Sequence, residues 1–397
     1  MNIAYLVNRY PTVSHTFVRR EILGIEAAGH RVHRFSIRAA PDDLPDPADR
    51  AERDKTAVIL TKPVPLLLGA AAVVLRRPGG AWAAWRASRA MTPPTARGLV
   101  TRVAYLAEAC SLSSAMHRAD VRHLHAHFGT NPAAVARMAH LISGISYSFT
   151  VHGPDEFDEP RQLDLAGKIA DAKFTVAISD YGRSQLCRWV DTAHWSRIVV
   201  VRCGVDLAAI DAAQANAEPG FDFCCIARLA PQKGLPILLE ALTLLGERGV
   251  RPRVALVGDG PLRDELERGI AARGLAGQVA LLGSKGGAEV AAQLRASRAM
   301  VLPSFAEGLP VVIMESLAVC TPVVTTAVAG IPELVDDGCG WIVPAGSVES
   351  LADAMAEALL ADAERRATMG AEGRRRVAHD HDAGRNAALL LKHMEAA

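Results

Sequence analysis

The sequence has little of what marks a secreted, redox-active or membrane-spanning protein. Its seven cysteines are scattered, none forms a Cys-x-x-Cys pair, and they imply no disulfide framework. Residues 64–75 are almost wholly apolar but too short to span a bilayer. The N-terminal residues lack a basic segment and a cleavage site, so they are predicted as a strand and not as a signal peptide. We therefore expect a cytoplasmic protein, either free or at the inner face of the membrane.

Composition and motifs exclude further classes. The formal net charge is +1, which gives no signal for a nucleic acid or another polyanion as partner. The chain contains no repeat of solenoid length, no nucleophile elbow, no P-loop and no glycine cluster of the dinucleotide-binding type. What is present is a chain of 397 residues, half of them hydrophobic, which is long enough for two α/β domains with separate cores.

Apolar runs alternate with helical patterns in both halves of the chain. Residues 2–7 are predicted as a strand, Ser14, His15 and Thr16 open a helix, and residues 31–37 form the next strand. In open parallel sheets, ligands bind at loops that follow the carboxyl ends of strands, as this first loop does. Residues 212–220 are small, polar and weakly periodic, and a second strand–helix series follows them. We therefore predict parallel sheets in two domains, residues 1–211 and 212–378.

The stretch at residues 302–324 is the one around which the second half is organised. A buried strand ends near residue 303, and an apolar helix begins at Pro310 after Glu307, Gly308 and Leu309. A helix start with free N–H groups suits a phosphate. Glu307 would lie before the helix and Glu315 inside it, so one carboxylate can hold a sugar and the other a ribose. The alternative is an ordinary strand–loop–helix unit with a capping glutamate.

Two cations lie in the first loop of the second half. Arg228 and Lys233 follow the strand at residues 221–226, and a glycine at 234 provides a tight turn. Such a pair suits a diphosphate, because arginine offers a fork of donors and lysine a point charge. The alternative is a pair of solvated surface cations.

Histidines alternate along residues 121–128. If this segment is a strand, His123, His125 and His127 share one face, and three such histidines can bind zinc. Because no further ligand is placed nearby, we favour a histidine at the strand end, His127, that faces a ligand cleft; ordinary core histidines are the third alternative. His152 ends the next strand in the same way. The acidic triplet at residues 380–382 joins two helices, so we expect capping there and no metal.

Arginines are concentrated between residues 76 and 137, a segment that contains nine arginines and only two acidic residues. One interpretation is a surface that lies on anionic lipid and meets a lipid-linked acceptor. The other is a set of core-packing helices with solvated arginines.

These motifs resemble the retaining glycosyltransferases of family four, and the N-terminal ones resemble the exopolysaccharide, colanic-acid-type branch. The matching segments occur in the family's order along nearly the whole chain, and the last is the most specific: AYLVNRYPTVSHTFVRREILGIEAAGHRV, HAHFGTNPAAVA, SFTVHGPDEF, VAISDYGRSQL, VVVRCGVD, IARLAPQKGLPILLEAL, LVGDGPL and FAEGLPVVIMESLAVCTPVV. His15 departs from the family, which usually has Glu in S-E-T-F, and the first loop lacks a glycine pair. Both departures concern the acceptor side.

The resemblance implies a GT-B fold, in which two Rossmann-like domains with parallel sheets face each other across a deep cleft. The C-terminal helix at residues 379–397 would then pack back on the first domain. The implied activity is transfer of a hexose-type sugar, with retention of configuration, from a UDP- or GDP-sugar to a hydroxyl. The acceptor would be a glycan, a lipid-linked sugar or a small molecule, and neither a cofactor nor a metal is implied.

The resemblance also assigns roles. Arg228 and Lys233 would bind the diphosphate, Glu315 the ribose, and Glu307 with Gly308, Leu309 and Pro310 the transferred sugar. His127 would face that sugar with His152 nearby, the backbone around Ser284 would meet the base, and Ser14, His15 and Thr16 would lie on the acceptor side. Two alternatives keep this fold: a nucleotide-sugar epimerase or hydrolase without an acceptor, and a non-catalytic nucleotide-sugar binding protein.

Overall fold

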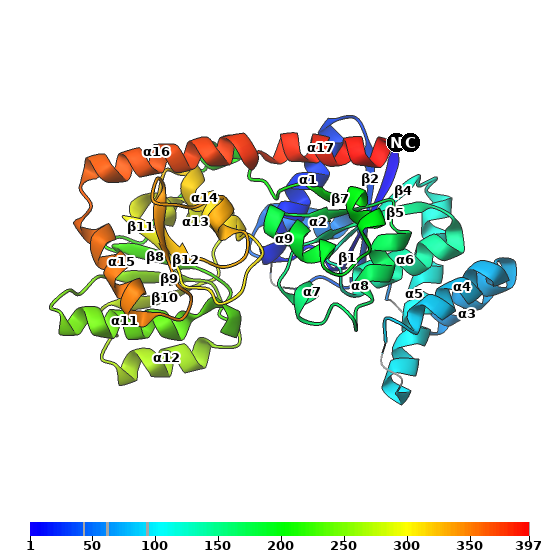
Figure 1. Cartoon of the computed structure of the whole chain (residues 1–397), viewed down its shortest axis with the longest axis horizontal. Coiled ribbons are helices and arrows are strands. Elements are labelled where there is room, and N and C mark those ends of the chain that lie inside the picture. The colour runs from blue at the N-terminus through cyan, green and yellow to red at the C-terminus, as the bar shows by residue number, and fades with distance from the viewer. Residues whose placement is uncertain (43, 61–62, 93–94, 397) are drawn as a thin grey trace. The chain divides into compact units, whose positions relative to one another are not determined.

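The computed structural model describes residues 1–42, 44–60, 63–92 and 95–396, and it divides into two compact units. The first unit contains residues 1–202 and the C-terminal residues from 384 onward, and the second contains Cys203–Ala383 (Figure 1). Each unit is built on one parallel sheet with helices on its faces. The predicted α/β class with two Rossmann-like sheets is confirmed.

The sheet of the first unit has seven parallel strands in the order β3-β2-β1-β4-β5-β6-β7. The strand order reverses between β1 and β4, so the loops after these two strands flank the switch point where ligands bind in doubly wound sheets. The strands are β1 (Asn2–Arg9), β2 (Arg31–Arg38), β3 (Thr56–Val58), β4 (His123–His127), β5 (Ser146–Val151), β6 (Phe174–Ala177) and β7 (Ile198–Val200).

Two hydrophobic clusters hold the helices of the first unit against this sheet. The C-terminal helix α17 belongs to one of them: its residues Ala387, Leu390 and Met394 are buried in the cluster that contains Tyr5 and Ile22. The helices are η1 (Val13–His15), α1 (Thr16–Ala27), α2 (Pro47–Lys55), α3 (Pro63–Arg76), α4 (Pro78–Ser88), α5 (Ala96–Arg118), α6 (Asn131–Ser143), α7 (Asp155–Asp158), α8 (Leu165–Asp171), α9 (Asp180–Cys187), η2 (Thr192–Arg197) and α17 (Ala383–Glu395).

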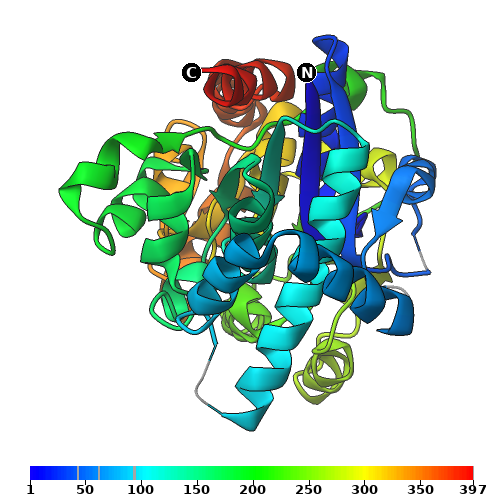
Figure 2. The same cartoon turned by 90° about the vertical axis from the view of Figure 1, so that its right-hand side faces the viewer.

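Helices α3 and α4 form a bent pair beside the long helix α5 at one side of the first unit (Figure 2). No single helix in the described ranges is long and apolar enough to cross a membrane. The segment from Val64 to Arg76 passes that test only together with α4, from which it is bent by 116°.

The sheet of the second unit has six parallel strands in the order β10-β9-β8-β11-β12-β13, so its switch point lies between β8 and β11. The strands are β8 (Phe223–Ile226), β9 (Val254–Val257), β10 (Val279–Gly283), β11 (Ala299–Leu302), β12 (Val323–Thr326) and β13 (Gly340–Val343). The helices are α10 (Leu207–Ala212), η3 (Pro231–Lys233), α11 (Leu235–Glu247), α12 (Arg263–Ala272), α13 (Gly287–Ala296), α14 (Val311–Ala318), η4 (Ile331–Glu333), α15 (Val348–Leu360) and α16 (Ala363–Asp380).

The division between the units lies at residues 202 and 383, whereas the sequence analysis placed it at 211 and 378. The reason is a set of contacts between residues 203–211 and the end of α16. The backbone N–H of Val205 donates to the carbonyl of His381, and Arg374 pairs with Asp211 at 2.7 Å. His381, the middle residue of the acidic triplet, is buried with Nδ1 2.9 Å from the carbonyl oxygen of Cys203.

The charged segment that follows β13 is two helices and not one. The charged pattern of residues 349–379 in the sequence predicts a single helix, and this prediction is wrong, because the chain breaks at Ala361 and Asp362 between α15 and α16. The Asp362 side chain accepts a hydrogen bond from the Arg365 backbone N–H, so it caps a new helix.

Candidate functional site

The loops after β8 and β11 interlock at the switch point of the second unit. The backbone N–H of Phe305 donates to the carbonyl of Gln232 at 2.8 Å. Gly234 has φ +61°, and a Cβ there would lie 2.1 Å from the carbonyl oxygen of Pro303. Only glycine allows this approach, which brings the end of η3 against the loop that contains Glu307.

This contact joins two of the predicted site residues. The Lys233 ammonium donates to Glu307 Oε1 at 2.6 Å, and the Ser304 hydroxyl donates to the same oxygen at 2.6 Å. The two side chains of the ion pair are 18% and 9% exposed. The resemblance described above implies a diphosphate contact for Lys233 and a sugar contact for Glu307, and the structure shows that these two residues are in direct contact.

Arg228 lies in the same loop with a different environment. Its side chain is exposed, and within the described ranges no acceptor for its guanidinium is found. The guanidinium is therefore available for an anion at the switch point, which is consistent with the predicted diphosphate contact.

The helix predicted to begin at Pro310 is α14, whose N-cap is Pro310 and whose first residue is Val311. Leu309 is buried, and the carbonyl of Gly308 accepts a hydrogen bond from the Gly330 backbone N–H, so the loop after β12 supports this segment. Glu315 lies inside α14 and is half-buried.

Ser284 is also at the carboxyl edge of this sheet. It is exposed and directly follows β10, whose last residue, Gly283, has φ +69°. β10 is the edge strand, two strands away from β8. The loops at the carboxyl edge of one sheet thus carry the two cations, Glu307 and Ser284, and Glu315 lies in the helix that follows one of these loops.

The alternating histidines of the first unit lie on β4, as predicted, and pair with polar residues of β5. His123 places its two ring nitrogens 2.9 Å from Ser146 Oγ and 2.7 Å from Ser148 Oγ. The Nδ1 atom of His125 lies 2.7 Å from Ser148 Oγ, and its Nε2 atom lies 2.9 Å from Thr150 Oγ1. This ladder follows the register of the two strands, and it leaves His123 no ring nitrogen for a metal ion.

Burial keeps these histidines neutral. It lowers the pKa of His123 to about 3, with a smaller contribution from the charge of Lys173. The pKa of His125 lies well below its usual value for the same reason, with further repulsion from neighbouring histidines.

His127 is the last residue of β4, at the strand end predicted for it, and it is also buried. Its ring is 0% exposed. Its Nε2 lies 3.2 Å from Glu21 Oε1 on α1, and its Nδ1 lies 3.0 Å from His152 Nε2 at the end of β5. Both ring nitrogens therefore have protein partners. His152 is 7% exposed, and burial followed by the charges of His127 and His15 lowers its pKa well below the usual value.

The loop after β1 holds the residues predicted to lie on the acceptor side. Ser14 is exposed in η1, whereas His15 and Thr16 are half-buried at the junction with α1. The His15 ring packs 5.1 Å from that of Phe128, which follows β4. The two loops at the switch point of the first unit are thus in contact.

The group of residues that could hold a metal ion differs from the three histidines considered as an alternative above. Among the described residues, Glu21, His125 and His127 bring three ligand atoms within 4.8 Å of one another. His123 is not part of this group, and the ring nitrogens of His125 and His127 already have protein partners.

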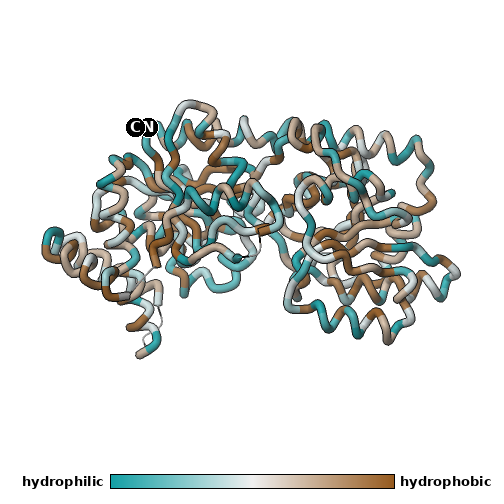
Figure 3. Tube along the Cα trace, turned by 180° about the vertical axis from the view of Figure 1, so that it is seen from behind, coloured by the Kyte–Doolittle hydropathy of each residue, from teal (hydrophilic) through white to brown (hydrophobic). Residues whose placement is uncertain are grey.

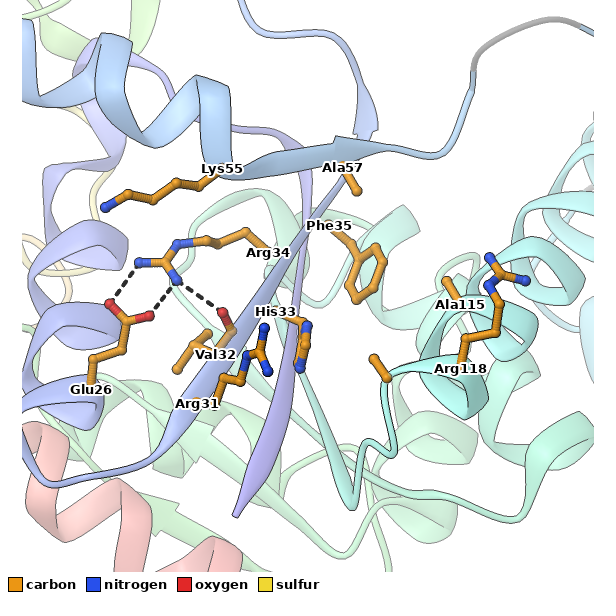
Figure 4. A pocket seen from close by; sticks show the side chains of 11 residues that line it. Glu26, Arg31, Val32, His33, Arg34, Phe35, Lys55, Ala57, Ala115 and Arg118 are labelled. Atoms are coloured by element: carbon orange, nitrogen blue, oxygen red, sulfur yellow. Dashed lines mark hydrogen bonds and ion pairs between the residues drawn. The ribbon is translucent and has the colours of Figure 1, made fainter.

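A pocket of about 540 Å³ lies elsewhere in the first unit, at the amino end of β2. Figure 4 shows that Arg34 crosses it and makes a bidentate contact with Glu26. Arg34 also donates to Glu52 at 2.9 Å. These are internal ion pairs at the edge of the sheet opposite to the switch-point loops.

Comparison with known proteins identifies the family. The family model for glycosyl transferases group 1 matches residues 208–376. WcaL of Escherichia coli (strain K12) is 31% identical over 302 residues, which are 71% of this chain and 72% of that protein. The chain belongs to the glycosyl transferases group 1 family. It is therefore a glycosyltransferase, and the family match supports transfer over the epimerase, hydrolase and non-catalytic alternatives.

Solved structures share the fold of this glycosyltransferase. Sucrose-phosphate synthase from Thermosynechococcus elongatus superimposes with a TM-score of 0.74 at 18% identity, over 99% of this chain and 98% of that one. HepE of Anabaena, in complex with UDP-glucose, gives 0.71 at 17% identity, over 99% of both chains. These matches confirm the predicted fold of two Rossmann-like domains, each with a parallel sheet.

Two contacts in this glycosyltransferase had no signal in the sequence alone. Glu21 meets His127 across 106 residues, and Lys233 meets Glu307 across 74. The sequence motifs identified His127, Lys233 and Glu307, but only the fold shows which side chains are their hydrogen-bond partners.

Proposed function

We propose that this glycosyltransferase moves a hexose-type sugar from a UDP- or GDP-sugar to a hydroxyl of a growing glycan, with retention of configuration. The observation that carries the proposal is the contact of Lys233 with Glu307, beside the exposed Arg228, at the switch point of the second sheet. Two relatives support it by name. WcaL is provisionally assigned to colanic acid biosynthesis, and HepE binds UDP-glucose.

The residue types suit the chemistry. As the bond from the anomeric carbon to the diphosphate breaks, the leaving group gains negative charge, which Arg228, Lys233 and the start of α14 stabilise. The carbon becomes oxocarbenium-like, and the carboxylate of Glu307 favours that positive charge. In the retaining course the acceptor attacks from the side of the leaving group, whose phosphate takes the acceptor proton. We propose that these fixed charges act without a metal cofactor.

The other predicted residues complete the donor site in this proposal. Glu315 holds the ribose hydroxyls, Gly308, Leu309 and Pro310 present backbone groups to the sugar, and Ser284 lies beside the base. His127 and His152 act from the first unit on the transferred sugar, and Ser14, His15 and Thr16 line the acceptor side.

The first experiment is a thermal-shift panel of nucleotide sugars, because a ligand that binds only the folded protein raises its melting temperature. The donor found is then incubated with candidate acceptors, and NMR of the product reads the anomeric configuration. An inverted product would refute retention. Release of free sugar at the same rate with and without acceptor would refute transfer.

We also propose that the acceptor is lipid-linked and that α3, α4 and α5 rest on anionic membrane. Leu75 and Leu68 of α3 are 82% and 68% exposed, Trp82 of α4 is 59% exposed, and Val100 of α5 is 70% exposed. Figure 3 shows hydrophobic colours along these helices. No acidic residue occurs between Asp54 and Glu108, although that interval contains eight lysines and arginines. Apolar side chains among unopposed cations are typical of an interfacial surface.

Vesicles test this surface. Vesicles with anionic lipid should bind the protein and release it at high salt, and Leu68→Asp with Leu75→Asp should abolish binding. Leu360→Asp is the matched control, since Leu360 is 86% exposed but lies on α15 of the second unit. Equal partitioning on neutral and anionic vesicles would refute the membrane proposal and favour a soluble acceptor.

A further inference from the structure

A chain of polar side chains links three elements at the switch point of the first sheet. Tyr5 on β1 donates its hydroxyl to Glu21 Oε1 at 2.6 Å. The same oxygen lies 3.2 Å from Nε2 of His127 at the end of β4, and Nδ1 of His127 lies 3.0 Å from Nε2 of His152. Tyr5 and His127 are 1% and 0% exposed, and the Glu21 side chain is 20% exposed.

The contacts determine where the protons lie. A carboxylate offers only acceptor atoms, so both the Tyr5 hydroxyl and Nε2 of His127 donate to Glu21. When Nε2 carries the single ring proton of His127, Nδ1 is an acceptor, and Nε2 of His152 donates to it. Burial, followed by the nearby charge of Glu21, raises the pKa of Tyr5 and keeps its hydroxyl protonated. Each contact in the chain thus has one donor and one acceptor.

We propose that Glu21 is a positioning residue, which holds His127 in the Nε2–H tautomer and in one orientation for sugar transfer. The proposal rests on the role proposed above for His127. A carboxylate that orients an imidazole through a ring N–H fixes its tautomer, and Glu21 does so from a helix whose buried face, Val18, Ile22 and Ile25, anchors it to the sheet.

The position of these hydrogen-bonded side chains in the fold distinguishes the proposed role from simple packing. β1 and β4 are the strands between which the strand order reverses, and Tyr5 and His127 lie on these two strands. His123 and His125, deeper along β4, are held by serine and threonine hydroxyls of β5. His127 alone of the three hydrogen-bonds to a carboxylate among the described residues, and it is the one nearest the loops where a ligand binds.

The test compares Glu21→Ala and Glu21→Gln in the full chain. Glutamine keeps an acceptor oxygen at the position that makes both contacts, whereas alanine removes it. Glu26→Gln is the matched control, because it removes a carboxylate from the same helix that pairs with Arg34 and with no residue of the site. Histidine ¹⁵N spectra report the tautomer, and His127→Asn assigns the His127 signals.

We expect Glu21→Ala to mix the tautomers of His127 and to lower kcat by about tenfold or more, with the donor KM changed by less than about twofold. Glu21→Gln should retain one tautomer and most of kcat, and Glu26→Gln should lower the melting temperature alone. An unchanged His127 tautomer in Glu21→Ala would refute the proposal. So would a fall of kcat no larger than that of Glu26→Gln.

Two further outcomes are informative. Stoichiometric zinc in the wild-type protein, lost in Glu21→Ala, would overturn the proposal, because Glu21 would then be a metal ligand. The spectra need no substrate, so they still test the Glu21–His127 contact if the wild-type chain transfers no sugar. In that case the proposed function fails while the contact is judged separately.

Discussion

The ion pair between Lys233 and Glu307 gives a prediction with an unusual sign. A diphosphate that binds the Lys233 ammonium competes for its charge with the Glu307 carboxylate, which lies 2.6 Å away. Replacement of Glu307 by Gln removes both this competitor and a negative charge near the phosphates. We therefore expect Glu307→Gln to bind free nucleoside diphosphate more tightly than the wild type, although it transfers sugar more slowly.

The size of the effect follows from the environment of the pair. Because less than a fifth of either side chain is exposed, solvent screens the pair little. A hydrogen bond with a charged partner contributes roughly 1.5–3 kcal/mol net. In the wild type, loss of this contact would reduce the binding free energy of the diphosphate by about 1.5 kcal/mol, the lower end of that range. Without this cost, the variant should bind the diphosphate about tenfold more tightly, since about 1.4 kcal/mol corresponds to tenfold.

Isothermal titration calorimetry with UDP and with GDP measures this gain, and Ser304→Ala is the matched control. Ser304 donates to the same oxygen of Glu307 but carries no charge, so its loss should change the diphosphate affinity by less than about threefold. In a Lys233→Met background, Glu307→Gln should lose most of its gain, because the competition no longer exists. Weaker diphosphate binding by Glu307→Gln, or an equal gain in both backgrounds, would show that the pair does not compete with the ligand.

Three further variants test the site and the buried network. Arg228→Ala should weaken diphosphate binding by roughly 1.5–3 kcal/mol at an unchanged melting temperature, and unchanged affinity in calorimetry would remove Arg228 from the site. Burial lowers the pKa of Lys168 from 10.5 to about 7, so the unfolded chain binds more protons between these values and the unfolding free energy should rise there by about 1.4 kcal/mol per pH unit. In Lys168→Met, the unfolding free energy measured by urea titration should lack this rise with pH. An equal dependence of the unfolding free energy on pH in the variant and the wild type would contradict the lowered pKa of Lys168. His123→Ala should lower the melting temperature at pH 7, because Ser146 and Ser148 lose a partner. It should also reduce acid sensitivity as the pH falls from 6.5 toward 3, because the unfolded chain protonates His123 first, and a wild-type acid profile would argue against a buried neutral ring.

The fold could be predicted because its signals are local. Each strand of a buried parallel sheet is a short apolar run. The predicted strands at residues 2–7 and 31–37 and the one that ends near residue 303 are β1, β2 and β11. The break between α15 and α16 also had a local signal, the capping residue Asp362. It was missed because the apolar and charged pattern continues on both sides of the break.

The partners within the site could not be predicted, because they depend on distances between loops. His127 occupies the strand end that its alternation with His123 and His125 predicts, but it is buried in contact with Glu21 on α1 and with His152, which follows β5. The spacing of residues in the sequence predicts the strand and the face on which a residue lies. It does not predict which other elements pack against that face. In the same way, the position of Lys233 in a loop did not reveal that Gly234 packs against the neighbouring loop and brings the ammonium to Glu307.

Both switch points therefore share one physical principle. Polar groups that are largely buried need partners, and here the groups of the candidate sites provide them for one another: Lys233 pairs with Glu307, and His127 pairs with Glu21 and with His152. A ligand that contacts such a group exchanges one partner for another, so its affinity reflects the difference between two interactions. For this reason, removal of a carboxylate can tighten one ligand while it slows the reaction. Effects of substitutions in this glycosyltransferase should be predicted from both members of each pair, and double-mutant cycles are the measurement that separates them.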